Sequence, residues 1–208
     1  MARFVEDFES RVTKRRLRAV DDLSGILRKG LPTDEWQSLM APLVGTLRDN
    51  NFKVCRGALE CVELLVGHLD GAIVPFLSAL TPAVVECLGN AKISVQSKGV
   101  DVLIAVSNPA VNGSSDTLCA LERSFRHKNW RVREQLVVYL GRVVGIDSAG
   151  LASRPALSSL LADALSDSSS EVRQQALAAA QRIHALMGDK LMTQLEGKGV
   201  RPTHLNAL

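Results

Sequence analysis

The 208-residue sequence predicts an all-α protein built from repeated helical hairpins. Two observations support this prediction. Leu, Ala and Val supply most of the apolar content while aromatic residues make up only 4% of the chain, and this composition favours helices packed on helices over a β-sandwich. In addition, one short pattern recurs five times at nearly constant spacing, which indicates a repeat architecture.

The recurring pattern is a valine followed five positions later by an aliphatic residue. It occurs in the segments SRVTKRRL, FKVCRGAL, ISVQSKGV, WRVREQLV and EVRQQAL. The valines are 42, 41, 37 and 40 residues apart and comprise Val12, Val54, Val95, Val132 and Val172. A period of about 40 residues is typical of HEAT and armadillo repeats, so the sequence predicts an α-solenoid of about five to six HEAT repeats.

Each repeat is predicted as two helices joined by a short turn. The first hairpin has a short opening helix near residues 2–9 and a second helix near 14–29. Apolar residues at helical spacing predict the later pairs over 33–50 and 54–69, 73–88 and 95–106, 115–125 and 132–144, and 156–165 and 172–186. We expect Trp36 to pack at the edge where the turns between repeats lie.

The repeats follow one another without a long linker, so the sequence predicts a single domain over residues 1–208. Residues 189–208 depart from the repeated pattern. We expect a terminal helix near 189–196 and a tail after it, which together cover the apolar face of the last repeat.

The cysteine and histidine spacing predicts no metal site. The four cysteines form no CxxC, and the four histidines complete no zinc-binding spacing around them. Cys61 and Cys87 fall in apolar helical phase, so we expect reduced thiols in the core. The acidic start MARFVEDFE has no apolar signal-peptide core, and we find no run of about 18 apolar residues that predicts a membrane span.

No catalytic motif is present in the sequence. GxSxG, P-loop and HExxH patterns do not occur, and no nucleophile, base and orienting group fall together in the predicted helices. The sequence therefore predicts a non-catalytic protein without a cofactor.

The turns inside the hairpins are predicted to line one edge of the stack, which we call the turn edge. Basic residues predominate there, namely Lys14, Arg15, Lys53, Arg56, Lys92, Lys98, Lys128, Arg131, Arg133 and Arg173. Two positions before the five valines stand Ser10, Phe52, Ile93, Trp130 and Ser170. The large apolar residues in this row either pack against each turn or form an exposed docking row. We expect Phe52 and Ile93 to be partly buried, while both readings stay open for Trp130.

Several segments resemble a known family beyond the general HEAT pattern. They are NNFKV, LGNAKISV, FRHKNWRVRE, LSDSSSEVR and KGVRPTHLN. In these segments the chain resembles a TOG domain, the tubulin-binding HEAT-repeat array of microtubule regulators, and it is most similar to the first array of the CLASP family. The resemblance extends over nearly the whole chain, including the C-terminal tail.

The resemblance implies that αβ-tubulin or the microtubule lattice binds the turn edge. The residues implied are Thr13, Lys14, Asn51, Phe52, Lys53, Lys92, Lys128, Asn129, Trp130, Arg131 and Arg173. Thr13 stands where many TOG arrays carry a tryptophan. The resemblance also implies a monomeric module of a longer protein that supports microtubule stabilisation and rescue at plus ends. Its expected location is the cytoplasm, on the microtubules of the cytoskeleton, spindle or cilium.

Two other classes of function compete with tubulin binding, namely nucleic-acid binding and a scaffold for a different protein partner. Basic residues around Trp130 superficially suit base stacking, but helical-repeat readers of nucleic acid use helix surfaces at every repeat, and only one strong stacking residue is present. We therefore expect no nucleic-acid partner. The alternative that stays open is a HEAT-repeat scaffold for a non-tubulin partner, such as a ciliary or kinetochore adaptor.

Overall fold

The computed structural model describes residues 2–30 and 36–208, and these residues contain helices and no strands. The predicted all-α class is confirmed. The chain divides into two compact units, Met1–Ala105 and Val106–Leu208, and each is described by itself. A single domain over 1–208 stays a prediction.

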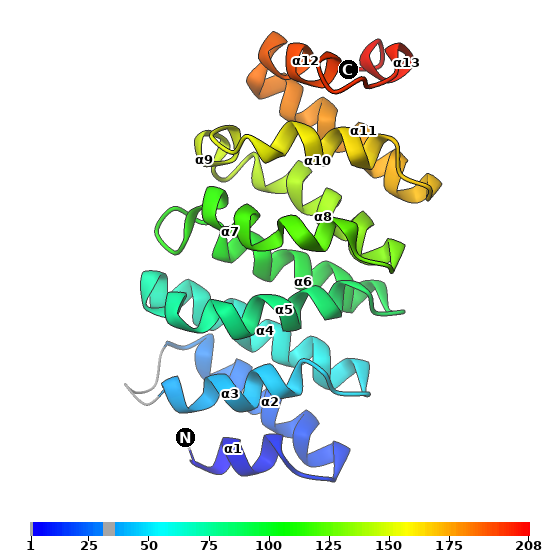
Figure 1. Ribbon diagram of the computed structural model, residues 1–208. Helices are drawn as coiled ribbons and strands as arrows, with labels where there is room; N and C mark the ends of the chain where they lie inside the picture. Colours follow the sequence, from blue (N-terminus) through cyan, green and yellow to red (C-terminus); the bar gives the residue numbers. More distant parts are fainter. Residues whose placement is uncertain (1, 31–35) are drawn as a thin grey trace. The chain divides into compact units, whose positions relative to one another are not determined.

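The first unit consists of helical hairpins that follow one another along the chain (Figure 1). Its elements are α1 (Ala2–Phe8), α2 (Thr13–Leu27), α3 (Gln37–Thr46), α4 (Phe52–Leu69), η2 (Asp70–Phe76), α5 (Leu77–Leu88) and α6 (Ile93–Val106), whose last residue falls in the second unit. The pairs α1–α2, α3–α4 and α5–α6 match the predicted hairpins. Helix α2 packs on α4, and Leu23, Leu43 and Leu59 are fully buried in this core.

The second unit continues the same arrangement and ends in two short helices. Its elements are α7 (Gly113–Leu121), η3 (Glu122–Arg126), α8 (Trp130–Val143), α9 (Ser148–Ala152), α10 (Ala156–Leu165), α11 (Ser170–Met187), α12 (Asp189–Glu196) and α13 (Pro202–Leu205). Helices α8 and α11 pack so closely that a β-carbon added at Gly141 would lie only 3.1 Å from the Cα of Ala179. Helix α12 has the predicted bounds and contacts α10 and α11, whereas α9 and α13 were not predicted.

Two predictions about buried side chains are confirmed in the first unit. Trp36 is buried, and its ring meets Phe76 edge-on with the ring centroids 5.4 Å apart. This contact lies beside the connection that follows α4, away from the turns inside the hairpins. Cys61 and Cys87 are buried free thiols.

The prediction concerning apolar runs needs a correction. The stretch Phe52–Leu88 contains a window long and apolar enough for a membrane span by length and composition. In the structure this stretch is interrupted, because α4 ends at Leu69 and Asp70, the first residue of η2, takes a positive φ of 44°. The apolar face of α4 packs against α2 and α3, as expected of a helix in a protein core.

Each turn inside a hairpin is closed by one side chain that accepts a hydrogen bond from the backbone N–H two residues later. The five closing residues are Ser10, Asp49, Asn90, His127 and Asp167, with donor–acceptor distances of 3.2, 2.8, 2.9, 3.1 and 2.8 Å to the nitrogens of Val12, Asn51, Lys92, Asn129 and Ser169. Short polar side chains favour such local bonds over continued helix. This bond therefore marks the equivalent position in every turn.

The closing residues correct the register of the first hairpin. Three residues after each of them the second helix begins, at Thr13, Phe52, Ile93, Trp130 and Ser170. Thr13, and not Ser10, is therefore the equivalent of Phe52. Val12 precedes α2 and is 55% exposed, so its match to the buried valines was wrong. Arg15 takes the position of those valines, and its guanidinium pairs with Asp7 of α1 at 2.6 Å.

Six residues after the closing residue, a long side chain reaches back to the turn in four of the five cases. These clamp residues are Arg16, Gln96, Arg133 and Arg173, which donate to the carbonyl oxygens of Ser10, Asn90, His127 and Asp167 at 2.7, 2.6, 2.7 and 2.7 Å. In the turn before α4 the position is held by Cys55, whose thiol donates to the carbonyl of Leu47 at 3.2 Å.

Two clamp arginines also join neighbouring turns. Arg16 pairs with Asp49, the closing residue of the next turn, at 2.5 Å. Arg133 pairs in the same way with Asp167, with nitrogen–oxygen distances of 2.7 and 2.8 Å. The Arg133 pair is largely removed from water, since the two side chains are 15% and 12% exposed. Each unit therefore holds adjacent turns together through a charged hydrogen bond.

Truncating α12 at its buried face should destabilise the chain. Leu195 is fully buried, so Leu195→Ala is expected to lower the free energy of unfolding by about 2–5 kcal/mol through lost burial and a cavity. Leu186→Ala is the control, since Leu186 is 59% exposed and its truncation should change stability by less than about 0.5 kcal/mol. Urea denaturation measures both, and equal effects would contradict the packing of α12.

Removing the Arg133 clamp should destabilise the second unit. Arg133→Met deletes the hydrogen bond to His127 and leaves the Asp167 carboxylate without its cation, so we expect a loss of about 1–3 kcal/mol. Arg123→Met is the matched control at an exposed arginine of η3, with an expected change within about 0.5 kcal/mol. Urea denaturation measures the loss of unfolding free energy in both variants. A larger loss in the control variant would refute the stabilising role of Arg133.

The same ion pair should make stability depend on pH at the acidic end. The Arg133 guanidinium, with the backbone N–H of Ser169, lowers the pKa of Asp167 below its ordinary value. A carboxyl with a lowered folded-state pKa stabilises the fold above its unfolded pKa of about 3.9, and this contribution is lost as pH falls through the folded value. Asp167→Asn should therefore flatten the decline in stability below about pH 4, measured by urea denaturation at several pH values.

The control for the pH experiment is Asp163→Asn, which alters a more exposed carboxylate of the same hairpin. It should leave the acid decline close to that of the unmodified chain. If Asp163→Asn and Asp167→Asn flatten the decline equally, the linkage does not arise from the clamp.

Candidate functional site

In the first unit, the structure brings the predicted residues of three turns to one edge. Arg16 and Asp49 join the turn before α2 to the turn before α4. Lys92 then joins the turn before α6 to the second turn, because its Nζ lies 5.2 Å from the centre of the Phe52 ring. Figure 1 shows the three turns on one side of this unit. The turns and the helix starts after them contain the predicted residues Thr13, Lys14, Asn51, Phe52, Lys53 and Lys92.

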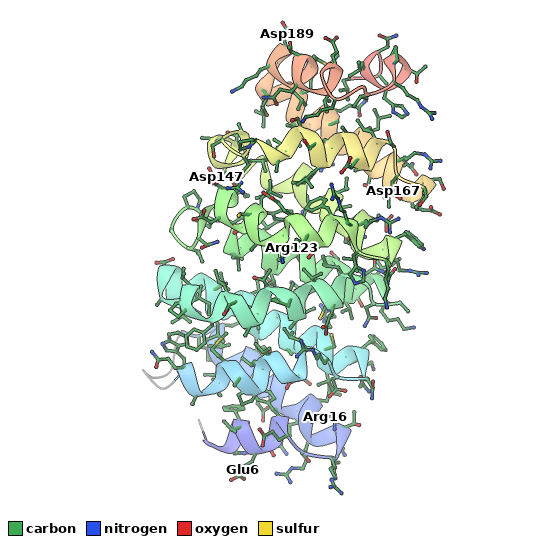
Figure 2. The ribbon with its side chains drawn as sticks, viewed as in Figure 1. Glu6, Arg16, Arg123, Asp147, Asp167 and Asp189 are labelled. Atoms are coloured by element: carbon green, nitrogen blue, oxygen red, sulfur yellow. The ribbon has the colours of Figure 1, made fainter. Side chains whose placement is uncertain are left out.

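In the second unit, the remaining predicted residues lie in two turns joined by Arg133 and Asp167. The turn before α8 carries Lys128, Asn129, Trp130 and Arg131, and the turn before α11 is followed by Arg173. Figure 2 places Asp167 at this edge and Asp147, which precedes α9, at the opposite edge of the unit. The turns inside the hairpins therefore lie on one side here as well.

Some of the predicted residues hold the turns in place. The side chains of Asn51 and Asn129 cap α4 and α8 by accepting hydrogen bonds from the N–H groups of Lys53 and Arg131 at 2.9 and 3.1 Å. Arg173 is the clamp of its own turn. An N-terminal cap stabilises a helix by about 1 kcal/mol, so these three residues fix the geometry of the edge.

The other polar residues of the set present their side chains to solvent. Thr13, Lys14, Lys53, Lys92, Lys128 and Arg131 are all exposed. Lys98, which was expected among the basic residues of the edge, pairs instead with Glu63 at 2.8 Å. The exposed positive charge at these turns therefore comes from lysines at the helix starts, from Arg56 and from Arg131.

The aromatic residues of the edge are half-buried, and each has a cation beside it. Phe52 is partly buried, as expected, and lies under the ammonium group of Lys92. Trp130 is also half-buried, and the guanidinium of Arg131 lies 4.7 Å from the centre of its ring. Such cation–π contacts contribute about 0.5–1 kcal/mol at exposed sites. Part of the Trp130 surface is thus already occupied by its own neighbour.

The expectation for Ile93 is wrong. Ile93 is 78% exposed, although its equivalents Phe52 and Trp130 are half-buried. At the first position of α6 its side chain is directed away from the core, and it lacks the large aromatic ring of Phe52 and Trp130.

The turn before α11 differs from the others in charge. Besides Asp167 it carries Glu171, whose pKa is lowered by hydrogen bonds from Ser169 and by its position at the helix start. Two carboxylates thus accompany Arg173 at this turn.

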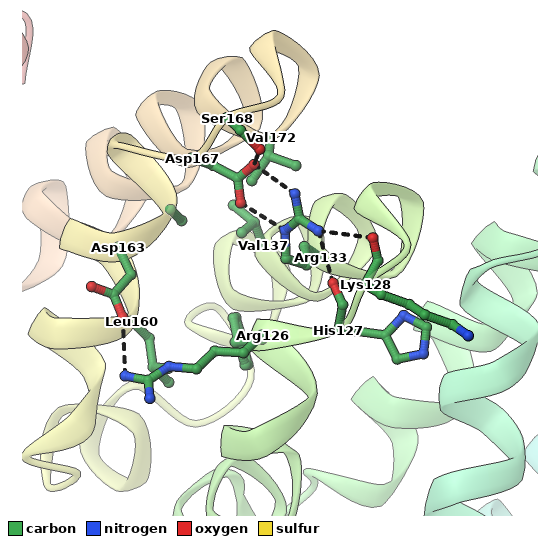
Figure 3. Close-up of a pocket in the computed structure, with 12 residues that line it drawn as sticks. Arg126, His127, Lys128, Arg133, Val137, Leu160, Asp163, Asp167, Ser168 and Val172 are labelled. Atoms are coloured by element: carbon green, nitrogen blue, oxygen red, sulfur yellow. Dashed lines mark hydrogen bonds and ion pairs between the residues drawn. The ribbon is translucent and has the colours of Figure 1, made fainter.

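A hollow of about 340 Å³ lies beneath the two turns of the second unit (Figure 3). Its floor is apolar and includes Val137, Leu160 and Val172. Two ion pairs lie around it, since Arg133 binds Asp167 and Arg126 lies 3.5 Å from Asp163. Lys128 also lines the hollow, and its side chain is exposed to solvent.

No metal centre is evident in the described part of the chain. Over residues 2–30 and 36–208 no cluster of three His, Cys, Asp or Glu side chains could hold a metal ion. Burial raises the pKa of the Cys61 thiol to about 12, which keeps it protonated and unreactive.

Comparison with known proteins gives relatives over most of the chain. No protein-family model matches it. The chain is 32% identical over 180 residues to the TOG array regulator of axonemal microtubules protein 1 of Homo sapiens, a match that covers 84% of this chain and 10% of that protein. It is 28% identical over 207 residues to a CLIP-associated protein of Arabidopsis thaliana, covering 94% of this chain and 14% of the relative.

A solved structure shares the fold as well. It comes from work on how crescerin uses a TOG domain array to regulate microtubules in the primary cilium, and it matches with a TM-score of 0.73 and 27% identity over 97% of this chain and 86% of that one. The chain thus spans a small part of the curated relatives and nearly all of the solved one. From these sequence relationships and the shared fold, the chain belongs to the TOG-domain family of HEAT-repeat arrays.

Proposed function

We propose that the chain is a non-catalytic microtubule-regulator module that binds αβ-tubulin or the microtubule lattice through the turn edge. In this role it supports microtubule stabilisation and rescue. The observation that carries the proposal is the set of five closed turns inside the hairpins. At four of them, exposed basic side chains lie at the start of the following helix. The microtubule-regulating roles in the names of its relatives support the same partner.

Charge and partly buried aromatic rings would contribute differently to this binding. Tubulin is acidic, so the exposed Lys53, Lys128 and Arg131 would speed encounter and make binding sensitive to salt. Phe52 and Trp130 would supply contact area that loses water on binding. Thr13 supplies little apolar area at the first turn, so the later turns would carry most of the affinity.

The wider role follows from the same proposal. The two compact units would act together as one domain over residues 1–208, with 189–208 covering the last repeat. The chain would serve as a monomeric module of a longer protein, without nucleic acid, membrane or cofactor as partners. It would act in the cytoplasm on the microtubules of the cytoskeleton, spindle or cilium.

Reversing single charges on the edge should weaken tubulin binding. Lys53→Glu and Arg131→Glu are each expected to reduce affinity for soluble tubulin and for stabilised microtubules by about five- to tenfold at low salt, and by less as salt rises. The control is Lys190→Glu, the same change at an exposed lysine of α12. Fluorescence anisotropy and co-sedimentation across a salt series measure the effect, with helicity checked by circular dichroism.

Two results would overturn the proposed function. One is that the unmodified chain binds neither tubulin form at low salt. The other is that Lys190→Glu weakens binding as much as the two edge variants do. Binding of polyuridine with an affinity similar to that for tubulin would favour a nucleic-acid partner instead.

Truncating the half-buried tryptophan should weaken the same interaction by a different route. Trp130→Ala is expected to reduce tubulin affinity by about tenfold, because it removes contact area and frees Arg131 from its ring. Its effect should persist at higher salt, unlike that of the charge reversals. An unchanged affinity would exclude Trp130 from the contact surface.

A further inference from the structure

Ile93 is the most exposed large apolar side chain in the part of the chain that the structure describes. Its exposure is 78%, and it stands at the first position of α6 on the turn edge. Single exposed apolar residues are common on protein surfaces and require no explanation by themselves. The surroundings of Ile93 are what give its exposure significance.

The backbone beneath Ile93 is held from both sides. The Asn90 side chain accepts the N–H of Lys92 at 2.9 Å, and the Gln96 amide donates to the carbonyl of Asn90 at 2.6 Å. Two residues further on, Val95 is fully buried. Ile93 is thus presented on a fixed backbone, and its β-branched side chain has few rotamers to lose on binding.

Basic groups lie beside this apolar side chain. Lys92 precedes it and extends its ammonium group over the Phe52 ring of the neighbouring turn. Lys53 follows Phe52 and is exposed. The first unit therefore presents a rigid apolar projection next to two lysines and the edge of a half-buried phenyl ring.

The other large side chains at this position are less available to a partner. Trp130 is half-buried and in contact with the Arg131 guanidinium. Phe52 is half-buried beneath Lys92. Ile93 therefore offers the largest exposed fraction of apolar surface among the first residues of the second helices.

We propose that Ile93 is the apolar anchor of the turn edge, inserting into an apolar depression bordered by carboxylates on αβ-tubulin. This inference rests on the proposed function. Burying a rigid aliphatic side chain at the centre of a ring of charges is the arrangement that concentrates binding energy in one residue. The flanking lysines complement an acidic rim and set the approach, while Ile93 slows dissociation.

An apolar anchor and a charged rim respond differently to salt. Screening weakens the attraction of Lys53 and Lys92 for an acidic surface, but it leaves burial of an aliphatic side chain nearly unaffected. Loss of Ile93 should therefore lower affinity by the same factor at every salt concentration. Loss of a flanking lysine charge should change the slope of affinity against salt.

The test compares Ile93→Ser with Ile93→Leu in tubulin binding across a salt series. Ile93→Ser is expected to weaken binding about tenfold with an unchanged salt slope, while Ile93→Leu stays within about twofold of the unmodified chain. Leu186→Ser is the matched control, since Leu186 is an exposed leucine at the end of α11, far along the chain from the turns. It should leave affinity unchanged. Because these side chains are exposed, the urea midpoints of all variants should agree.

The possible outcomes distinguish failure of the role proposed for Ile93 from failure of the proposed tubulin binding. If Ile93→Ser binds normally while Lys53→Glu binds weakly, the anchor is refuted and the turn edge stands. If Ile93→Leu or Leu186→Ser weakens binding as much as Ile93→Ser, the effect is not burial of Ile93 and the anchor is again refuted. If the unmodified chain does not bind tubulin at all, the proposed function fails and the anchor fails with it.

Discussion

A hydrogen bond from a backbone N–H to the side chain two residues earlier closes every turn inside the hairpins, and the start of the following helix depends on it. Each such bond contributes only about 0.5–1.5 kcal/mol, so buried leucines and valines supply most of the stability. The bond instead fixes where the second helix begins. As a result, Thr13, Phe52, Ile93, Trp130 and Ser170 occupy equivalent places in their hairpins.

The basic residues of the chain divide between two tasks according to their chemistry. Arg16, Arg133 and Arg173 bind carbonyl and carboxylate oxygens within and between the turns, and the planar guanidinium suits several such acceptors at once. The lysines at the helix starts are exposed to solvent instead. The sequence therefore shows more positive charge at the turns than is available to a partner, because some of the arginines are already paired within the turns.

Periodicity predicted the helical class, the hairpins and the bounds of α12, because these depend on buried apolar side chains at regular spacing. The register of the first hairpin could not be predicted this way, since Val12 has the same spacing as the buried valines although it is exposed. The closing residues, which mark the true register, share no single residue type. The expectation for Ile93 was wrong for a related reason. Whether a turn residue is exposed depends on side-chain reach in three dimensions.

The most direct test of the turn edge as a tubulin-binding surface is amide hydrogen exchange of the chain with and without tubulin. Binding is predicted to slow exchange at the turns before α2, α4, α6 and α8, with the largest change around Lys92 and Ile93. Connections between hairpins, such as residues 70–76 and 144–150, should exchange as before. Protection confined to those connections, or to helix faces remote from the turns, would contradict the account.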